Sequence, residues 1–244
     1  MNTFAKITAT EAKLFLRAPF AAAGGLLLPS ILLLAIGAIP GMSKPNEAAG
    51  GLRLLDAWVP SLIVVSLAML ALQSIPAAVA TYREQGVLRR LATTPVHPVN
   101  LLGAQLLIHV VVSLAGIVLV LVLGNVVHDV PLPKHPLSFA LTLVLGVVAT
   151  FALGLIAAAV ARTSKAATGV ALVAFLPIMF FGGVYLPRPF LPDVLRRIGD
   201  YVPPGSQPLQ DAWIGAGVQP LQLAALAGFA VLGTALAVRL FRWE

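Results

Sequence analysis

Residues 99–127 decide the fold, and they read VNLLGAQLLIHVVVSLAGIVLVLVLGNVV. The stretch contains no Asp, Glu, Lys or Arg, and most of its side chains are aliphatic. A helix crosses the hydrocarbon core of a bilayer with about 20 apolar residues, so this stretch is long enough to span a membrane. The apolar residues follow one another without alternation, which favours a helix over a strand of a membrane β-barrel.

Further stretches of the same character lie on both sides of it. The six predicted spans are residues 20–40, 54–80, 99–127, 137–161, 166–186 and 218–240. The first begins too far into the chain and is too long for a cleaved signal peptide, and five more spans follow it. We therefore expect an all-α integral membrane protein in which residues 1–244 form a single transmembrane domain with six transmembrane helices.

The composition of the whole chain agrees with this expectation. Residues of the types AVILMFWYC make up 59% of the 244 residues, DEKR only 10%, and the mean hydropathy is +0.96. Soluble proteins contain about 45–50% apolar residues with glycine included and about 25% charged residues. The chain has no cysteine, which excludes disulfides, thiolate metal sites and a cysteine nucleophile.

The charged residues between the spans are unevenly distributed, and this predicts the orientation. With the N-terminus inside, the inner basic residues are Lys6, Lys13, Arg17, Arg83, Arg89, Arg90, Arg162, Lys165, Arg239 and Arg242, and the inner acidic residues are Glu11, Glu84 and Glu244. The outer residues are Lys44, Arg53, Lys134, Arg188, Arg196 and Arg197 against Glu47, Asp56, Asp129, Asp193, Asp200 and Asp211. The whole net charge of +7 then lies inside, as the positive-inside rule expects. We expect both termini in the cytoplasm, a place in the inner (cytoplasmic) membrane, and no nucleic-acid partner.

The N-terminal residues 2–18 predict an amphipathic helix that lies in the inner interface of the membrane. Its apolar residues fall on one face and its basic residues on the opposite face at 100° per residue. Glu11 falls on the apolar face. A carboxylate there is costly unless it finds a basic partner or reaches water. The alternative is a frayed helix end that leaves Glu11 solvated.

Two segments between the spans have unusual patterns. In residues 82–92, Glu84, Val87, Leu88 and Leu91 share one face at helical spacing. Such a helix suits docking into a groove on a cytosolic partner, or it anchors the chain on anionic lipid. Residues 187–214 are broken by prolines and glycines into pieces too short to span, at about 192–200 and 206–214. We expect either a re-entrant pair of half-helices in the outer leaflet or an ordinary outer loop.

Few polar groups lie inside the predicted spans, and His109 is the lone titratable candidate. A single membrane histidine favours an interhelical hydrogen bond over a proton relay. The sequence contains no phosphate-binding loop, no H-E-x-x-H and no G-x-S-x-G. His128, Asp129 and His135 are a weak pattern for a metal site. We therefore expect no catalytic residue, no metal and no cofactor bound by this chain.

Three motifs carry a resemblance to the membrane permease subunits of type-2 ATP-binding-cassette exporters, the group that includes daunorubicin-resistance-type drug exporters. The first is Arg83-Glu84-Gln85-Gly86-Val87-Leu88-Arg89-Arg90-Leu91 with Thr94-Pro95, which is similar to the inner-loop pattern of the family. The second is Leu176-Pro177-Ile178-Met179-Phe180-Phe181-Gly182-Gly183-Val184-Tyr185-Leu186-Pro187, which is similar to the end of its fifth span. The third, Pro208-Leu209-Gln210-Asp211-Ala212, resembles the segment before its last span.

The resemblance implies partners and site residues. Two permease chains, identical or paralogous, would pair in the lipid bilayer, and each would dock one cytosolic ATP-binding subunit that holds ATP and Mg. Residues 2–18 would form the interfacial elbow helix, 82–92 the cytoplasmic coupling helix, and 187–214 the outer re-entrant segment. The implied coupling residues are Arg83, Glu84, Gly86, Val87, Leu88, Arg89 and Leu91, and the implied outer-gate residues are Gly182, Gly183, Pro187, Tyr201 and Trp213.

The implied function is ATP-driven export of a small amphipathic or hydrophobic compound, such as a drug, a natural product or a lipid. The sequence assigns no Asp, Glu, Lys or Arg to the membrane interior, so the pathway is expected to have apolar walls, which favour such a cargo. A self-contained channel or secondary carrier is the alternative, and it should show short broken helices in both halves. Here the broken segment occurs once, near the C-terminus. A membrane-embedded enzyme or structural anchor would need a catalytic constellation that the sequence does not contain.

Overall fold

A computed structural model describes residues 3–17, 19–47, 51–92, 99–185 and 191–241. Within these ranges the chain is helical, and its β-structure is a single isolated bridge between Pro45 and Arg53. The predicted all-α fold class is therefore confirmed. The α-helices are α1 (Thr3–Leu16), α2 (Pro19–Leu26), α3 (Leu28–Gly37), α4 (Leu54–Ala68), α5 (Ile75–Glu84), α6 (Val87–Ala92), α7 (Val99–His128), α8 (Pro136–Val160), α9 (Ser164–Phe181), α10 (Asp193–Gly199), α11 (Ser206–Trp213) and α12 (Pro220–Leu240). A π-helical segment, η2 (Met69–Ser74), joins α4 to α5.

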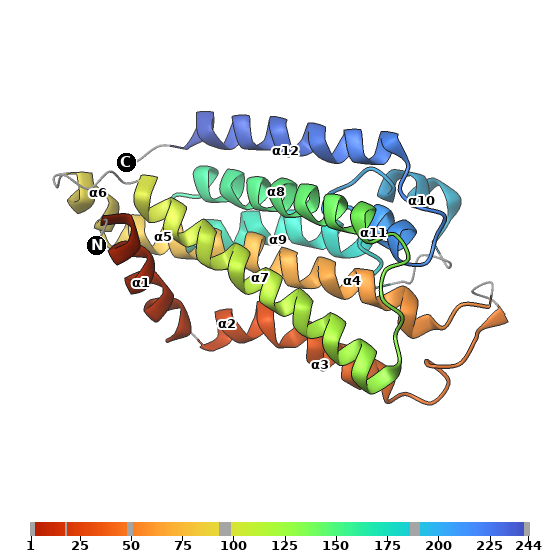
Figure 1. Ribbon diagram of the computed structural model, residues 1–244. Helices are drawn as coiled ribbons and strands as arrows, with labels where there is room; N and C mark the ends of the chain where they lie inside the picture. The colour runs from red at the N-terminus through yellow and green to blue at the C-terminus, as the bar shows by residue number, and fades with distance from the viewer. Residues whose placement is uncertain (1–2, 18, 48–50, 93–98, 186–190, 242–244) are drawn as a thin grey trace.

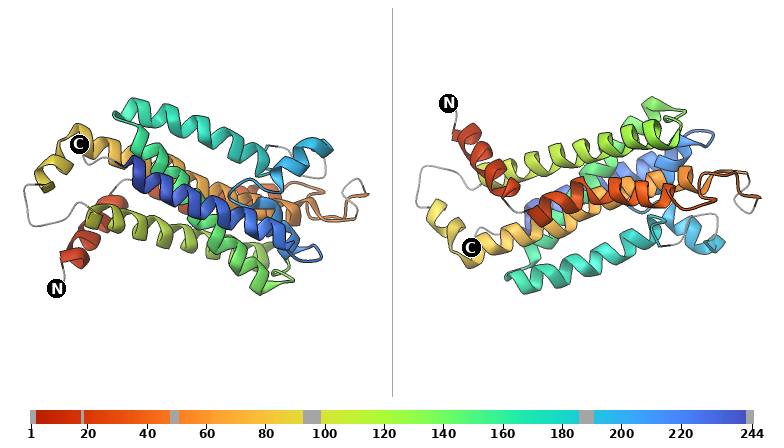
Figure 2. Two further views of the ribbon diagram at one scale, coloured as in Figure 1. Left: turned by 90° about the horizontal axis from the view of Figure 1, so that it is seen from above. Right: turned by 90° about the horizontal axis from the view of Figure 1, so that it is seen from below.

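The long helices run roughly side by side and give the molecule two ends (Figure 1). Helices α1 and α6 and the last turn of α12 lie at one end, which we call the α6 end. Helices α10 and α11 and the connection from α7 to α8 lie at the opposite, α11 end. The segment α4–η2–α5 is the most buried span, and the further views place it between α7 on one side and α9 on the other (Figure 2).

Five helical segments are long and apolar enough to cross a membrane, among the residues that the structure describes. They are Leu54–Glu84, Val99–His128, Pro136–Val160, Ser164–Phe181 and Pro220–Leu240. The predicted first span, 20–40, is instead divided into α2 and α3, each too short to cross alone. The count of six transmembrane helices therefore stays a prediction. The helix that corresponds to the predicted fifth span, 166–186, is α9, which begins at Ser164 and ends at Phe181, so the prediction extended too far toward the C-terminus.

Pro29 explains how the divided first span remains anchored in the bundle. Because proline has no N–H, the carbonyl of Gly25, four residues earlier, loses its helical donor. The hydroxyl of Ser66 in α4 donates to that carbonyl at 2.7 Å. Gly116 of α7 packs at the same point, where an added Cβ would lie 3.0 Å from the Gly25 oxygen. Three spans therefore meet at one backbone carbonyl.

A second close contact forms where the middle span changes its helical period. The N–H of Ile75 donates to Leu70, five residues back, and Pro76 has no N–H, so the carbonyl of Ala71 has neither an α-type nor a π-type donor. This carbonyl lies directly against Gly154 of α8, where any Cβ would collide with it. Glycine at 154 lets the two backbones approach, as small residues do at membrane helix interfaces.

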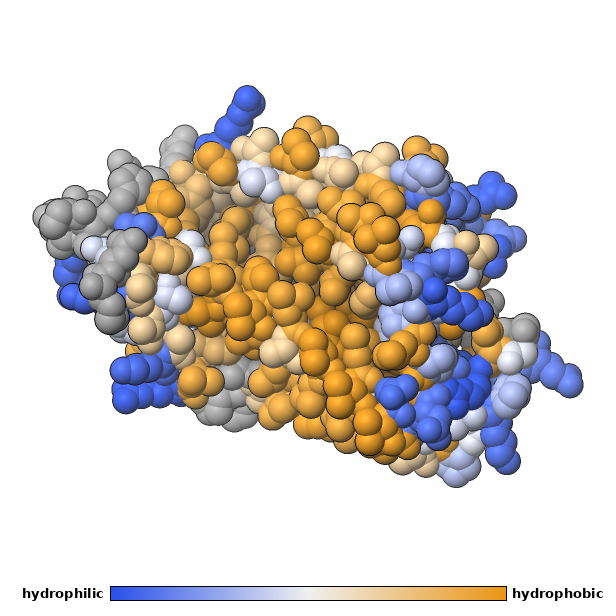
Figure 3. Space-filling view, in the orientation of Figure 1, coloured by the Kyte–Doolittle hydropathy of each residue, from blue (hydrophilic) through white to orange (hydrophobic). Residues whose placement is uncertain are grey.

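The exposed surface between the two ends is apolar. In Figure 3 a wide hydrophobic band separates hydrophilic surfaces at either end of the visible face. Large exposed side chains recur along α7, α8, α9 and α12, among them Val118, Val144, Val173 and Val231. Exposed apolar surface of this extent is costly in water and is the normal surface of a protein in lipid. The chain is therefore a multi-pass membrane protein.

We predict that Gly154→Ala destabilises the protein, although alanine favours helices more than glycine does. The added methyl group must push α8 away from the Ala71 carbonyl, and overpacking of this kind costs about 1–3 kcal/mol. Gly228→Ala in α12 is the matched control, because nothing lies within 4 Å of its Cβ position. Thermal unfolding in detergent should show a lower midpoint for Gly154→Ala alone. Equal midpoints for the two variants would contradict the proposed packing.

Candidate functional site

Arg83, at the end of α5, binds the C-terminus of α8. Its Nη1 atom donates to the carbonyl oxygens of Ala158 and Ala161 at 2.6 Å each. Its guanidinium also lies over the ring of Phe241, 5.2 Å from the centroid. The last carbonyls of a helix carry partial negative charge and lack helical donors, so a guanidinium is a favourable partner for them.

Glu84, the next residue, binds the N-terminus of α9. Its carboxylate accepts hydrogen bonds from the backbone N–H of Ser164 at 2.9 Å and from the Ser164 hydroxyl at 2.6 Å. Free N–H groups at a helix N-terminus favour a negative charge. Two consecutive residues of opposite charge therefore hold the turn between α8 and α9, and we call this arrangement the helix-end clamp. Arg83 and Glu84 therefore make contacts within the chain, and the sequence motif did not indicate these contacts.

The predicted helix over 82–92 is divided in the structure. It breaks at Gly86, which has a φ of +67°, so the segment consists of the end of α5 and the separate helix α6. Residues on the two pieces therefore do not follow one continuous helical face. Leu88 is buried and Arg89 is exposed, while the side chain of Leu91 lies outside the described residues. Contact of these residues with an ATP-binding subunit stays a prediction.

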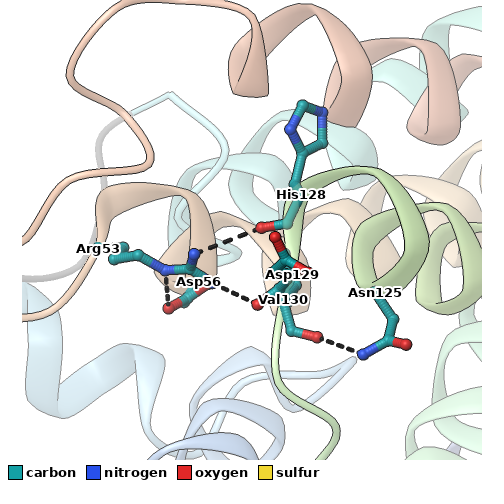
Figure 4. A network of polar contacts seen from close by, with 6 residues as sticks. All are labelled: Arg53, Asp56, Asn125, His128, Asp129 and Val130. Carbon is teal, nitrogen blue, oxygen red and sulfur yellow. Dashed lines mark hydrogen bonds and ion pairs between the residues drawn. The ribbon is translucent and has the colours of Figure 1, made fainter.

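A second polar network joins two connections at the α11 end (Figure 4). Arg53 binds both carboxylate oxygens of Asp56, at 2.9 and 2.8 Å, and donates to the backbone carbonyls of His128 and Asp129. The hydrogen bonds that Arg53 donates to Asp56 raise the pKa of Arg53 above its ordinary value. Asp129 has a φ of +52°, which turns the chain out of α7 toward Arg53. The network fastens the start of α4 to the end of α7.

Helices α10 and α11 occupy the positions expected for the two short outer segments. Gly183, with a φ of +72°, and buried Gly182 follow the end of α9. Pro187 lies outside the described residues. The hydroxyl of Ser206 donates to the carbonyl of Phe181 at 3.0 Å and ties α11 to the end of α9. Entry of α10 and α11 into the outer leaflet of the membrane stays a prediction.

The two aromatic residues among the implied outer-gate residues differ in their surroundings. Tyr201 is 36% exposed, as an interfacial ring would be. Trp213 is 1% exposed and packs edge-on against Phe139 of α8, with ring centroids 5.5 Å apart. Helix α11 turns the Trp213 side chain into the protein core, and a part of Trp213 in an outer gate stays a prediction.

The segment Pro208–Ala212 lies within α11 and contacts the start of α12 through Asp211. Leu209 and Ala212 are fully buried, whereas Asp211 points toward α12. Its carboxylate accepts from Gln207 at 2.5 Å and from Gln222 at 3.1 Å. Gln222 also forms a capping box with Gln219 at the start of α12. This motif thus fixes the angle at which the last span leaves α11.

A cavity of about 490 Å³ lies toward the α6 end between α1, α2, η2, α5 and α7. Its wall residues are Glu11, Leu14, Phe15, Gly24, Gly25, Met69, Gln73, Ser74, Ala77, Ala78, Thr81, Tyr82, Gln105 and His109. We call it the inner cavity. The polar side chains of its wall come from separate parts of the sequence, so no single predicted span indicated that they gather in one cavity.

Glu11 lies in the wall of the inner cavity, and only 7% of its surface is exposed. Its Oε2 atom accepts hydrogen bonds from the hydroxyl of Tyr82 at 2.8 Å and from the amide of Gln105 at 2.5 Å. The partners are uncharged and lie on α5 and α7. The expected basic partner, reach to water and frayed helix end are therefore all wrong for Glu11. Burial raises its pKa above the ordinary 4.5, although both hydrogen bonds oppose the shift.

His109 forms the interhelical hydrogen bond that its position predicts. One ring nitrogen, Nε2, lies 2.8 Å from the Ser74 hydroxyl at the end of η2, and Nδ1 lies 2.7 Å from the carbonyl of Gln105. In the neutral ring Nδ1 donates to that carbonyl, which leaves Nε2 to accept from Ser74. Among the described residues, no three His, Cys, Asp or Glu side chains gather as a metal site.

We predict that the buried carboxyl of Glu11 makes the protein more stable as the pH falls. Its folded-state pKa is raised, so the stabilisation by protonation is complete below the ordinary value of 4.5 and is lost as the pH rises through the raised value. Thermal midpoints between pH 4.5 and about pH 8 should therefore rise more on acidification in the natural protein than in Glu11→Gln. All other residues are the same in the two proteins, so the difference between the two pH profiles reports on position 11. Identical pH profiles would contradict the raised pKa.

Comparison with known proteins agrees with this architecture. Residues 3–205 match the family described as ABC-2 type transporter. The chain is 22% identical over 204 residues, which is 83% of its length, to a protein named "Putative transport permease YvfS" from Bacillus subtilis (strain 168), and the match covers 81% of that protein. Members of this family are membrane subunits of ATP-binding-cassette transporters, and membership implies an ATP-binding partner. The chain belongs to the ABC-2 type transporter family.

Proposed function

We propose that this chain is the permease subunit of an ATP-driven exporter and moves an amphipathic or hydrophobic compound across the cytoplasmic membrane. A separate subunit would bind and hydrolyse ATP with Mg, and this chain would supply the pathway. Family membership supports the general assignment. The observation that carries the coupling part is the helix-end clamp, because it connects the segment beside α6 to two spans at once.

In this proposal α6 is the element that meets the ATP-binding subunit. It follows Gly86 at the α6 end, and Arg89 and Arg90 are exposed on it. A displacement of α6 would be passed to α5 and, through Arg83 and Glu84, to the ends of α8 and α9. Charge-assisted hydrogen bonds to helix ends suit this role, since they are strong and directional. Arg83 and Glu84 would then act as positioning residues for α6.

The proposed complex contains two permease chains. Helices α9 and α12 carry many exposed apolar side chains, which either lipid or a second chain can cover. Helices α10 and α11, held against α8 and α9, would close the pathway at the outer side. The apolar walls of the spans favour an amphipathic or hydrophobic cargo, since such a compound needs few polar partners in the membrane.

We predict that Glu84→Arg uncouples ATP hydrolysis from export or weakens assembly with the ATP-binding subunit. The substitution replaces the carboxylate at the α9 N-terminus by a cation, which the helix dipole repels. Co-purification with the ATP-binding subunit and export by proteoliposomes measure the two effects. Normal assembly together with normal export would contradict the proposed coupling role of Glu84.

Ser164→Ala separates a positioning role of Glu84 from direct contact with the ATP-binding subunit. It removes one donor of the helix-end clamp and leaves the carboxylate available to a partner. If Glu84 acts through the clamp, Ser164→Ala reduces export in the same direction as Glu84→Arg. If Glu84 contacts the partner directly, Ser164→Ala leaves export unchanged. Glu47→Arg, the same charge change in the exposed connection between α3 and α4, is the matched control.

The proposed orientation places both termini and α6 in the cytoplasm. The chain has no cysteine, so single cysteines can be labelled without background. A cysteine at Ser43 or His135 should react with a membrane-impermeant maleimide from outside, whereas one at Thr93 or Ser164 should react only after permeabilisation. Outside labelling at Ser164 would reverse the orientation. Thr93 lies outside the described residues and tests the same side independently.

A further inference from the structure

The carboxylate of Glu11 is deeply buried, lines an open cavity and takes part in none of the ion pairs among the described residues. We propose that the inner cavity binds a lipophilic amine, a compound with a protonated amino group on an apolar body, and that this ammonium group binds Glu11. The proposal rests on the proposed function and deepens it by naming the class of compound. It assigns to the elbow helix α1 a part in ligand binding.

The first argument is that the Glu11 carboxylate can accept further hydrogen bonds. Both hydrogen bonds to Glu11, from Tyr82 and Gln105, end on Oε2. The ion pairs observed among the described residues do not include Glu11. Lys13 and Arg17 lie on the exposed side of α1. A buried carboxylate is stabilised most by an opposite charge, and a ligand ammonium that approaches Oε1 from the cavity would supply it.

The second argument is that the other polar side chains of the wall, apart from Gln73, already have hydrogen-bond partners within the protein. His109 is held between Ser74 and the carbonyl of Gln105. The hydroxyl of Thr81 donates to the carbonyl of Ala77 within its own helix at 2.8 Å. Glu11 therefore remains the wall group with both formal charge and free acceptor capacity. The cavity thus favours a ligand with one cationic donor over a ligand rich in polar groups.

The third argument is the shape of the cavity. Its wall follows the middle span from Met69 to Tyr82, a rise of roughly 20 Å at 1.5 Å per residue. Glu11 and Tyr82 line it near the end of α5, whereas Gly24, Gly25 and Met69 line the part deeper in the bundle. A volume of about 490 Å³ falls within the range of small-molecule sites. An amphiphile with a cationic head and an apolar body fits this polarity.

Aromatic rings in the wall add to the preference for a cation. Phe15 packs edge-on against His109, with ring centroids 5.1 Å apart, and Tyr82 donates its hydroxyl to Glu11. Both rings line the same cavity as the carboxylate. Ring faces attract ammonium groups, and the attraction grows when water is excluded. A neutral amphiphile of the same shape gains neither this attraction nor the charge pair.

The experiment measures binding to the permease in complex with its ATP-binding subunit, in nanodiscs of phosphatidylglycerol and without nucleotide. The probe is dansylcadaverine, a fluorescent primary amine, and its N-acetyl derivative is the matched neutral compound. Fluorescence anisotropy, corrected with empty nanodiscs, should show the amine binding at least about tenfold more tightly than the neutral compound. Glu11→Gln, which keeps an oxygen acceptor for Tyr82 and Gln105, should remove this preference. Glu47→Gln, an exposed carboxylate, is the control that should retain it.

Two results would overturn the proposal. One is equal binding of the amine and its acetyl derivative to the natural protein, and the other is an unchanged affinity for the amine in Glu11→Gln. Ala78→Trp tests the place of the site without changing Glu11, because it fills the cavity from α5. It should weaken the binding of the amine at least about tenfold. Full binding to this variant would place the amine elsewhere and also overturn the proposal.

The amine can come from a small molecule or from the headgroup of a lipid, and a second bilayer distinguishes them. Binding is repeated in nanodiscs that contain phosphatidylethanolamine, which carries a primary amine. Competition by this lipid supports the site and assigns its occupant to the bilayer, whereas undiminished dye binding supports a small-molecule amine. Because no nucleotide is present, a failure of ATP coupling leaves the result unchanged. Failure of amine binding with normal export would overturn this inference and leave the proposed function standing.

Discussion

The packing of the bundle depends on how carbonyls that lose their helical donors to prolines find partners in a membrane. Water is absent from the hydrocarbon core, so a carbonyl without a donor must be met by another part of the protein. Pro29 removes the donor of Gly25, and Ser66 replaces it at 2.7 Å. Pro76 and η2 leave Ala71 without its helical donor, and the close approach of Gly154 covers it with a Cα–H group. These two carbonyls bring together the first, second, third and fourth predicted spans, and they explain why the middle span is the most buried.

At the ends of the helices, charged side chains provide hydrogen-bond partners for the backbone groups that lack helical partners. Arg83 binds the last carbonyls of α8, Glu84 binds the first N–H of α9, and Arg53 binds the carbonyls that follow α7. Each pairing places a charge opposite the partial charge of a helix end. The connections between spans are consequently fixed by a few specific bonds. In the proposed function, the bonds of Arg83 and Glu84 would be the points through which an ATP-binding subunit moves whole helices.

The positions of the second, third, fourth and sixth predicted spans were predictable because hydrophobicity is a local property of about 20 consecutive residues. The predicted short segments at 192–200 and 206–214 also correspond closely to α10 and α11, since proline and glycine mark their limits. Other features depend on partners far along the chain. Glu11 meets Tyr82 and Gln105, 71 and 94 residues away, and Trp213 meets Phe139. The break at Gly86 was missed because a single glycine is often tolerated in a helix, and only the backbone angle reveals the turn.

Three consecutive residues at the end of α5 connect the inner cavity to the helix-end clamp. Tyr82 binds Glu11 of α1, Arg83 binds the end of α8, and Glu84 binds the start of α9. Side chains of neighbouring helical residues point about 100° apart, so one turn of helix can contact three different elements. A cation bound at Oε1 of Glu11, as proposed, would share the carboxylate with the Tyr82 hydroxyl and would lie one residue away from the groups proposed to position α6. In the proposed function, ligand binding and the contact with an ATP-binding subunit would thereby be joined through a single turn of helix, without a distant conformational pathway between them.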